Sequence, residues 1–166
     1  WARRSTGCRR GRGGWMALDE DTRILAGVRL FQGFTGEQVR LLAFGAERLV
    51  LPAGRRLFRQ DDAADCAYVV VRGLVRMFYE DRGERVPVAD VGPGTLVGEL
   101  ALIADTKRLT GAEAHEESEL LKIDRRIFRR ILEEYPEIAV TLHRRISADI
   151  RDLVSRLEAA AARLEP

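Results

Sequence analysis

Short β-rich runs occupy the middle of the chain, from residue 49 to residue 124, and they limit the possible folds more than any other feature. Glycine, proline and acidic turn residues interrupt these runs about every 8–12 residues. Parallel strands need long crossover connections, and the turns here leave no room for them. The pattern therefore favours an antiparallel sandwich, jelly roll or barrel.

Eight strands are expected from these runs. They fall at residues 49–51, 57–58, 66–71, 74–79, 85–91, 96–97, 109–115 and 118–124. The pair Arg72-Gly73 predicts a tight hairpin between the third run and the fourth. The predicted fold is α+β and mainly β, an eight-stranded jelly-roll β-barrel.

Helical periodicity flanks the strands on both sides. A first helix is expected with Asp19 as its N-cap, and a second with the capping box Thr35 and Gln38, ending near Gly45. After the strands, an apolar face spaced three and four residues apart predicts a helix over residues 124–135. Pro136 then suits the first turn of a long last helix.

The last helix carries a near-heptad apolar seam. Its members are Leu142, Ile146, Ile150, Leu153 and Leu157. Such a seam is typical of a parallel two-helix interface, and it predicts a homodimer. The alternative is a helix that packs back onto its own barrel. The expected domain organisation is thus a barrel with flanking helices over residues 16–135 and a dimerisation helix over residues 136–166.

The basic residues are unevenly distributed. Residues 1–15 hold five arginines and no acid, which fits a nucleic-acid arm, a targeting peptide or sequence upstream of a natural start at Met16. We favour the last interpretation and treat residues 1–15 as an upstream, disordered segment. Residues 16–166 hold 23 basic and 26 acidic side chains, a net charge of about −3. This body has no basic stripe, so we expect no direct DNA binding.

Other classes of protein find little support. No apolar run is long enough to span a membrane, and no nucleophile or metalloprotease motif is present, so we expect neither a membrane protein nor an enzyme. Cys8 and Cys66 have no disulfide or metal spacing, and His115 and His143 form no ligand cluster. We therefore expect a cytoplasmic protein with no metal or bound cofactor.

One segment carries chemistry, the stretch from Gly98 to Thr110. A glycine permits close backbone approach, a helical turn beginning at Leu100 directs amide groups at an anion, and Arg108 offers a charged fork. Glu99 suits a sugar hydroxyl rather than a phosphate. Together these residue types predict a site for a ribose that carries one phosphate.

The unbroken run Gly98-Glu99-Leu100-Ala101-Leu102, followed by Arg108, resembles the phosphate-binding cassette of the cyclic-nucleotide-binding domain family of the Crp/Fnr type. The resemblance extends over residues 18–150 and implies a β-barrel that binds a cyclic nucleotide, without a DNA-binding domain. It implies that Glu99 binds the ribose 2′-hydroxyl and Arg108 the cyclic phosphate. The implied ligand-binding residues are Gly98, Glu99, Leu100, Arg108, Leu109 and Thr110.

The cassette departs from the family pattern at two positions. Lys107 replaces a proline, which is expected to loosen the loop and to add a charge. Leu109 replaces a small or hydroxyl residue and adds bulk, and Thr110 is expected to face the other side by strand alternation. In the bacterial activators of this family, hydroxyl residues on the last helix contact the base. In this chain Leu153 and Val154 stand at those positions.

The sequence thus predicts a sensor that binds a cyclic nucleotide, with cyclic AMP as the expected ligand, and that signals through its C-terminal helices. Two alternatives stay open. One is a transcription regulator, truncated or working with a DNA-binding partner, and the other is a degenerate barrel that serves as a dimerisation or scaffold module. In the degenerate case Glu99 and Arg108 would pair with each other.

Overall fold

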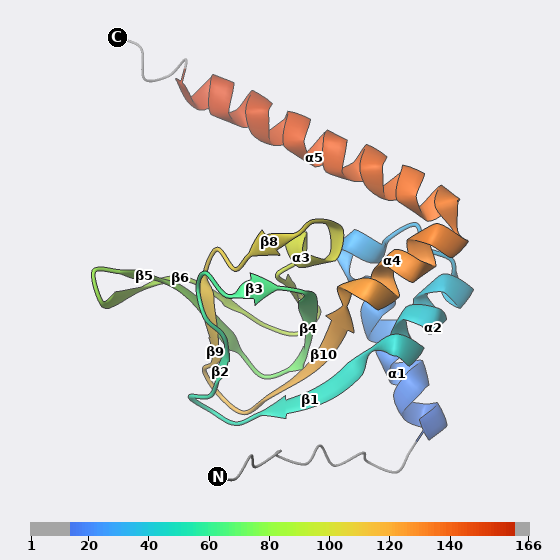
Figure 1. The fold of residues 1–166 in the computed structure, drawn as a ribbon, viewed down its shortest axis with the longest axis horizontal. Coiled ribbons are helices and arrows are strands. Elements are labelled where there is room, and N and C mark those ends of the chain that lie inside the picture. The colour runs from blue at the N-terminus through green and yellow to red at the C-terminus, as the bar shows by residue number, and fades with distance from the viewer. Residues whose placement is uncertain (1–13, 162–166) are drawn as a thin grey trace. The chain divides into compact units, whose positions relative to one another are not determined.

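The computed structural model describes the backbone of residues 14–161 and the side chains of residues 16–148 and of Arg151. The chain divides into two compact units, Trp1–Ile131 and Leu132–Pro166, which are described separately below. Figure 1 shows the order of the elements along the chain.

The first unit holds ten strands among its described residues. They are β1 (Glu47–Leu51), β2 (Arg56–Phe58), β3 (Ala63–Ala64), β4 (Cys66–Arg72), β5 (Val75–Asp81), β6 (Glu84–Val91), β7 (Leu96–Val97), β8 (Thr106–Lys107), β9 (Gly111–Ala114) and β10 (Ser118–Asp124). One sheet has the order β1-β10-β4-β7 and a second the order β2-β9-β5-β6, and all pairs are antiparallel. The α+β, mainly β jelly-roll prediction is confirmed.

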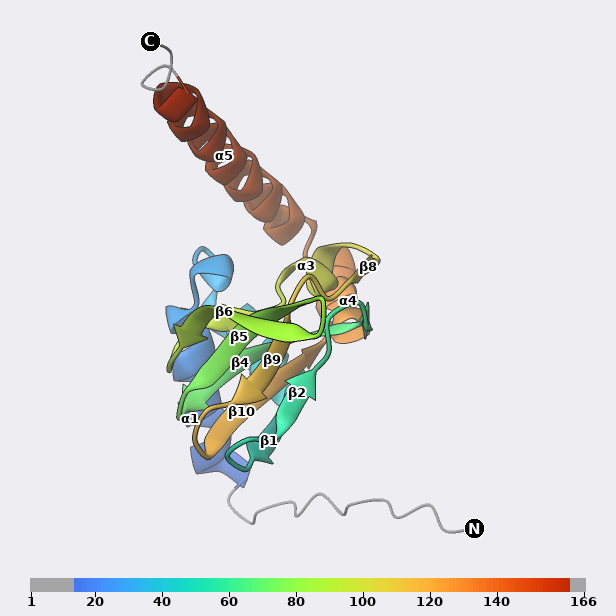
Figure 2. The same ribbon diagram turned by 90° about the vertical axis from the view of Figure 1, so that its left-hand side faces the viewer.

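The strand count and the closure differ from the prediction. The eight expected strands form the two four-stranded sheets, which face each other without closing into one hydrogen-bonded barrel among the described residues (Figure 2). The strands β3 and β8 form a separate two-stranded ladder that the sequence did not predict. Neither Ala63-Ala64 nor Thr106-Lys107 consists of two bulky apolar residues as Leu96-Val97 of β7 does, and for that reason the pattern of the sequence missed them.

The core lies between the two sheets. It contains Phe58 from β2, alternate residues of β4 such as Tyr68, Val75 from β5 and Leu120 from β10. The opposite face of β4 is also buried, with Val69 fully inaccessible. Because both faces of β4 are covered, its run of apolar residues is continuous rather than alternating.

The expected hairpin at Arg72-Gly73 is wrong. β4 pairs with β10 and β7, whereas β5 pairs with β6 and β9, so the chain passes from one sheet to the other at this turn. The hydroxyl of Ser118 accepts a hydrogen bond from the Leu74 amide at 3.2 Å and holds the crossing in place. Turn residues determine where a chain reverses, but they do not determine the partner of the next strand.

The helices agree with the sequence with one exception. They are α1 (Gly14–Gly27), the 3-10 turn η1 (Arg29–Phe31), α2 (Gly36–Gly45), α3 (Leu100–Ile103), α4 (Arg125–Glu134) and α5 (Pro136–Ala161). The capping box is present, since Thr35 Oγ1 accepts from the Gln38 amide and Gln38 Oε1 from the Thr35 amide. Asp19 is not an N-cap, because α1 already begins at Gly14, and its carboxylate instead pairs with Arg40 at 3.1 Å.

The second unit consists of the end of α4 and the long helix α5, which begins at Pro136 as expected. Leu142 is buried and Ile146 half-buried, but the side chains of Ile150, Leu153 and Leu157 lie outside the described residues. The dimer interface therefore stays a prediction. No described helix combines the length and the apolar character needed to cross a membrane.

Candidate ligand-binding site

The predicted cassette forms a tight backbone turn after β7. Gly98 has a φ of +76°, in the left-handed region that favours glycine, and Glu99 is the N-cap of α3. The amides of Ala101 and Leu102 bond within the turn, to the carbonyls of Gly98 and Glu99. The amides of Glu99 and Leu100 have no internal partner among the described residues and stay available to an acceptor.

Arg108 points into the core between the sheets and is only 5% exposed. Its Nη2 donates to the Cys66 carbonyl at 2.7 Å, and its guanidinium carbon lies 4.3 Å from the centre of the Phe58 ring. The centre of the Tyr68 ring lies 5.7 Å from the same guanidinium carbon. Its Nε and Nη1 are buried and have no hydrogen-bond partner.

The β3–β8 ladder fixes the position of the backbone at Arg108. Lys107 pairs with Ala63, and the next residues extend the contact: the Arg108 amide donates to the Asp62 carbonyl and the Asp61 amide to the Arg108 carbonyl, each at 2.8 Å. Lys107 was expected to loosen this segment. Instead the segment is tied to the chain around Asp61 through its own backbone.

The guanidinium of Arg108 occupies the space that a side chain at Gly98 would fill. A Cβ added at Gly98 would lie 2.3 Å from Arg108 Nη1, far below any van der Waals separation. The expected close approach of a ligand anion at this glycine stays a prediction. The close approach in the structure is made by the arginine of the same cassette.

A cavity of about 200 Å³ lies in front of Arg108. It is lined by all six predicted site residues, Gly98, Glu99, Leu100, Arg108, Leu109 and Thr110, together with Phe58, Ala64, Met77, Ala101, Thr106 and Lys107. Thr110 was expected to face away from Leu109. Both line the cavity, because residues 109–110 precede β9 and do not follow strand alternation.

Glu99 is exposed at the cavity and forms no ion pair with Arg108 within the described part of the chain. The alternative in which these two residues neutralise each other is thus not what the structure shows. Their separation leaves the carboxylate of Glu99 and the guanidinium of Arg108 available to different groups of one ligand.

The surroundings of Arg108 leave its charge uncompensated. Among the described residues no carboxylate lies within ion-pair distance of it, and its nearest polar side chain is the thiol of Cys66, 3.4 Å from Nη2. Burial raises the pKa of this thiol, which keeps it neutral although Tyr68 and Arg108 act in the opposite direction. A buried cation without a counter-ion is unfavourable, so the site is suited to an anion.

Sequence reasoning missed the residues that hold Arg108. From the sequence, Phe58, Cys66 and Tyr68 have the pattern of core residues in short strands. Cys66 was accordingly interpreted as a core residue. The sequence showed that their side chains alternate toward the core. It did not show the strand register that brings them next to Arg108. The described residues hold no group of three or more side chains suited to a metal ion.

Comparison with known proteins covers most of this chain. Residues 48–135 match the family model of the cyclic nucleotide-binding domain. A cyclic nucleotide-binding-like protein from Brucella abortus is 60% identical, and its structure superposes with a TM-score of 0.65 over 69% of this chain and 99% of that one.

Two longer relatives share the same region. The cyclic AMP receptor protein of Thermus thermophilus is 34% identical over 129 residues, which are 77% of this chain and 60% of the relative. Lysophospholipase nte1 of Aspergillus fumigatus is 32% identical over 114 residues, 68% of this chain and only 8% of the relative. This chain therefore spans little more than half of the cyclic AMP receptor protein and only a small part of the lysophospholipase.

Proposed function

We propose that this chain, which belongs to the cyclic nucleotide-binding domain family, binds cyclic AMP in the cavity between Gly98 and Thr110 and acts as a sensor. The observation that carries the proposal is Arg108, a buried cation with two unpartnered donors, Nε and Nη1. A cyclic phosphate has the charge and the paired oxygens that such a fork accepts. Its binding would replace an unfavourable burial with charge-assisted hydrogen bonds.

The remaining groups of the cavity suit the remaining groups of the ligand. The free amides of Glu99 and Leu100 offer further donors to the phosphate, and in this proposal the exposed carboxylate of Glu99 accepts a hydrogen bond from the ribose 2′-hydroxyl. Leu100 and Leu109 are 46% and 72% exposed, and they provide apolar surface for the base. Adenine is favoured over guanine because Leu109 offers no hydroxyl to a guanine edge.

The output of the sensor is proposed to pass through α4. At the start of this helix the amide of Arg125 donates to the Asp65 carbonyl at 2.9 Å, and its Nη1 donates to the Ala104 carbonyl at 2.7 Å. Asp65 precedes Cys66, which holds Arg108, and Ala104 ends α3. A ligand that moves either side of the cavity would therefore act on the beginning of α4.

A cytoplasmic location is part of this proposal. Cyclic nucleotides act as intracellular messengers, and the free, buried thiol of Cys66 beside Arg108 suits a reducing compartment. The downstream partner is not specified by the nucleotide site.

Calorimetry with the wild-type chain tests the ligand. We expect cyclic AMP to bind more tightly than cyclic GMP. It should also bind more tightly than 2′-deoxy cyclic AMP, because the deoxy analogue lacks the hydroxyl that donates a hydrogen bond to Glu99. In Glu99→Gln the loss should be about 1–3 kcal/mol, and the preference over the 2′-deoxy analogue should shrink. If millimolar cyclic AMP and cyclic GMP release no heat and do not raise the melting temperature, the scaffold alternative replaces this proposal.

We further propose that residues 16–135 form the binding domain and that residues 136–166 join two copies of it through the seam on α5. The chain should then sediment as a dimer, and Ile150→Glu with Leu157→Glu should give monomers, because each interface would bury unpaired charge at a cost of several kcal/mol. His143→Glu with Arg151→Glu is the control, since both side chains are exposed. A wild-type monomer at micromolar concentration contradicts the interface.

A further inference from the structure

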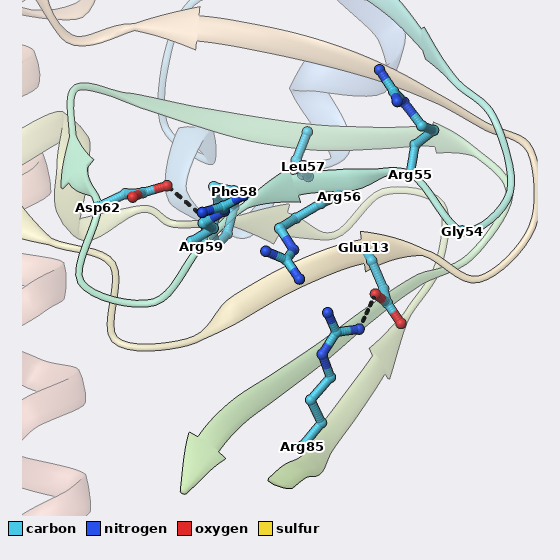
Figure 3. A pocket seen from close by; sticks show the side chains of 9 residues that line it. All are labelled: Gly54, Arg55, Arg56, Leu57, Phe58, Arg59, Asp62, Arg85 and Glu113. Carbon is cyan, nitrogen blue, oxygen red and sulfur yellow. Dashed lines mark hydrogen bonds and ion pairs between the residues drawn. The ribbon is translucent and has the colours of Figure 1, made fainter. Parts of the chain in front are cut away.

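A second and larger cavity lies on the outer face of the sheet β2-β9-β5-β6 (Figure 3). It is a groove of about 600 Å³, and its charged lining consists of Arg55, Arg56, Arg59, Arg85, Asp62 and Glu113. Figure 3 shows Arg56 from β2 and Arg85 from β6 pointing into the same space. Guanidinium groups repel each other, and these two share one carboxylate, that of Glu80, whose Oε1 lies 3.6 Å from Arg85 Nε and 4.0 Å from Arg56 Nη2.

The acidic residues of the groove are already engaged. Glu113 accepts from Arg85 Nη1 at 2.8 Å, and Asp62 accepts from the Arg59 amide at 2.9 Å. Arg56 has only one carboxylate within ion-pair distance among the described residues, that of Glu80, at the limit of 4.0 Å. The side chains of Arg55 and Arg59 have no ion pair in the described part of the chain. Positive charge is therefore in excess along the groove.

This excess is local. On the same sheet Arg76 forms two hydrogen bonds to the Asp90 carboxylate, at 2.8 and 2.9 Å, and is fully paired. Residues 16–166 as a whole carry a net charge of about −3, with 23 basic and 26 acidic side chains. An acidic partner would thus be repelled by most of the domain and attracted to this groove.

The shape indicates the kind of partner. The groove follows residues 54–59, which include the three-residue edge strand β2 (Arg56–Phe58). Arg56 and Arg85 face the same part of the groove, whereas the side chain of Arg55 points away from it (Figure 3). The Arg85 guanidinium is held over the Phe78 ring, 4.7 Å from its centre, which reduces the entropy lost on binding.

From these observations we propose that the groove binds an extended acidic segment of a partner protein, whose carboxylates pair with Arg56 and Arg85. This inference goes beyond the nucleotide site and does not depend on it. It provides the sensor with a surface through which a second protein can be engaged.

Fluorescence anisotropy with a labelled octaglutamate peptide tests the groove. All proteins are full-length chains in which the five arginines of residues 1–15 are replaced by glutamine, so that this segment adds no background. We expect Arg56→Gln with Arg85→Gln to weaken peptide binding by about tenfold or more. The matched control, Arg72→Gln with Arg126→Gln, removes the same charge from side chains that are 75% and 91% exposed, and it should change the affinity by less than about twofold.

Three results would overturn the proposal. They are equal losses in the two double variants, no measurable binding of the peptide by the parent chain, or displacement of the peptide by micromolar inorganic pyrophosphate, which would indicate a small polyphosphate ligand instead. Cyclic AMP titration of both double variants is run in parallel. Because the groove variants leave the Arg108 cavity intact, failure of the nucleotide proposal would appear in all proteins alike.

Discussion

Replacing Arg108 by leucine is expected to weaken cyclic AMP binding by roughly 30-fold to several-thousand-fold, the usual cost of about 2–5 kcal/mol for removing one partner of a buried charge pair. Leucine retains apolar contact with Phe58, but it has no guanidinium group to donate hydrogen bonds to the cyclic phosphate. Isothermal calorimetry of the wild type and the variant measures the ratio.

The same substitution should not destabilise the ligand-free protein. Arg108 buries a charge with two unpartnered donors, Nε and Nη1, and a buried ion replaced by an apolar side chain is often neutral or stabilising. The melting temperature of Arg108→Leu without ligand should therefore equal or exceed that of the wild type. Arg72→Leu is the control, since Arg72 is 75% exposed and lies outside the cavity. Unchanged cyclic AMP affinity in Arg108→Leu would contradict the role given to this residue.

Replacing Gly98 by alanine is the second large effect. The new Cβ would lie 2.3 Å from Arg108 Nη1, so the guanidinium must shift from its present position beside Phe58. We expect cyclic AMP affinity to fall by about tenfold or more, because the donors no longer face the phosphate. Backbone strain at φ +76° should in addition lower stability by about 1–2 kcal/mol.

Gly94→Ala separates the two causes. Gly94 has a φ of +82°, and an added Cβ would meet nothing within 4 Å. Both variants should therefore lose similar stability in thermal unfolding, whereas only Gly98→Ala should lose ligand affinity in calorimetry. If Gly94→Ala loses as much affinity, the effect of Gly98→Ala comes from strain and not from the displaced arginine.

The sequence determined those features that depend on local chemistry. The capping box of Thr35 and Gln38 needs only residues three apart, and the start of α5 at Pro136 needs only the fixed φ of proline. The eight predicted runs had the composition of strands and became the two main sheets. The cassette was also visible, because its glycine, acid and arginine lie within one short stretch.

The tertiary structure decided what depends on partners far apart in the chain. Nothing local in Arg72-Gly73 indicates that β4 and β5 enter different sheets, and nothing near Arg108 indicates that Cys66 and Phe58 will hold its side chain. A side chain becomes a buried, unpaired cation only when strand register places it between two sheets. Register follows from packing across the whole core, and it is that packing, with contacts between distant residues, that makes the cavity suited to an anion.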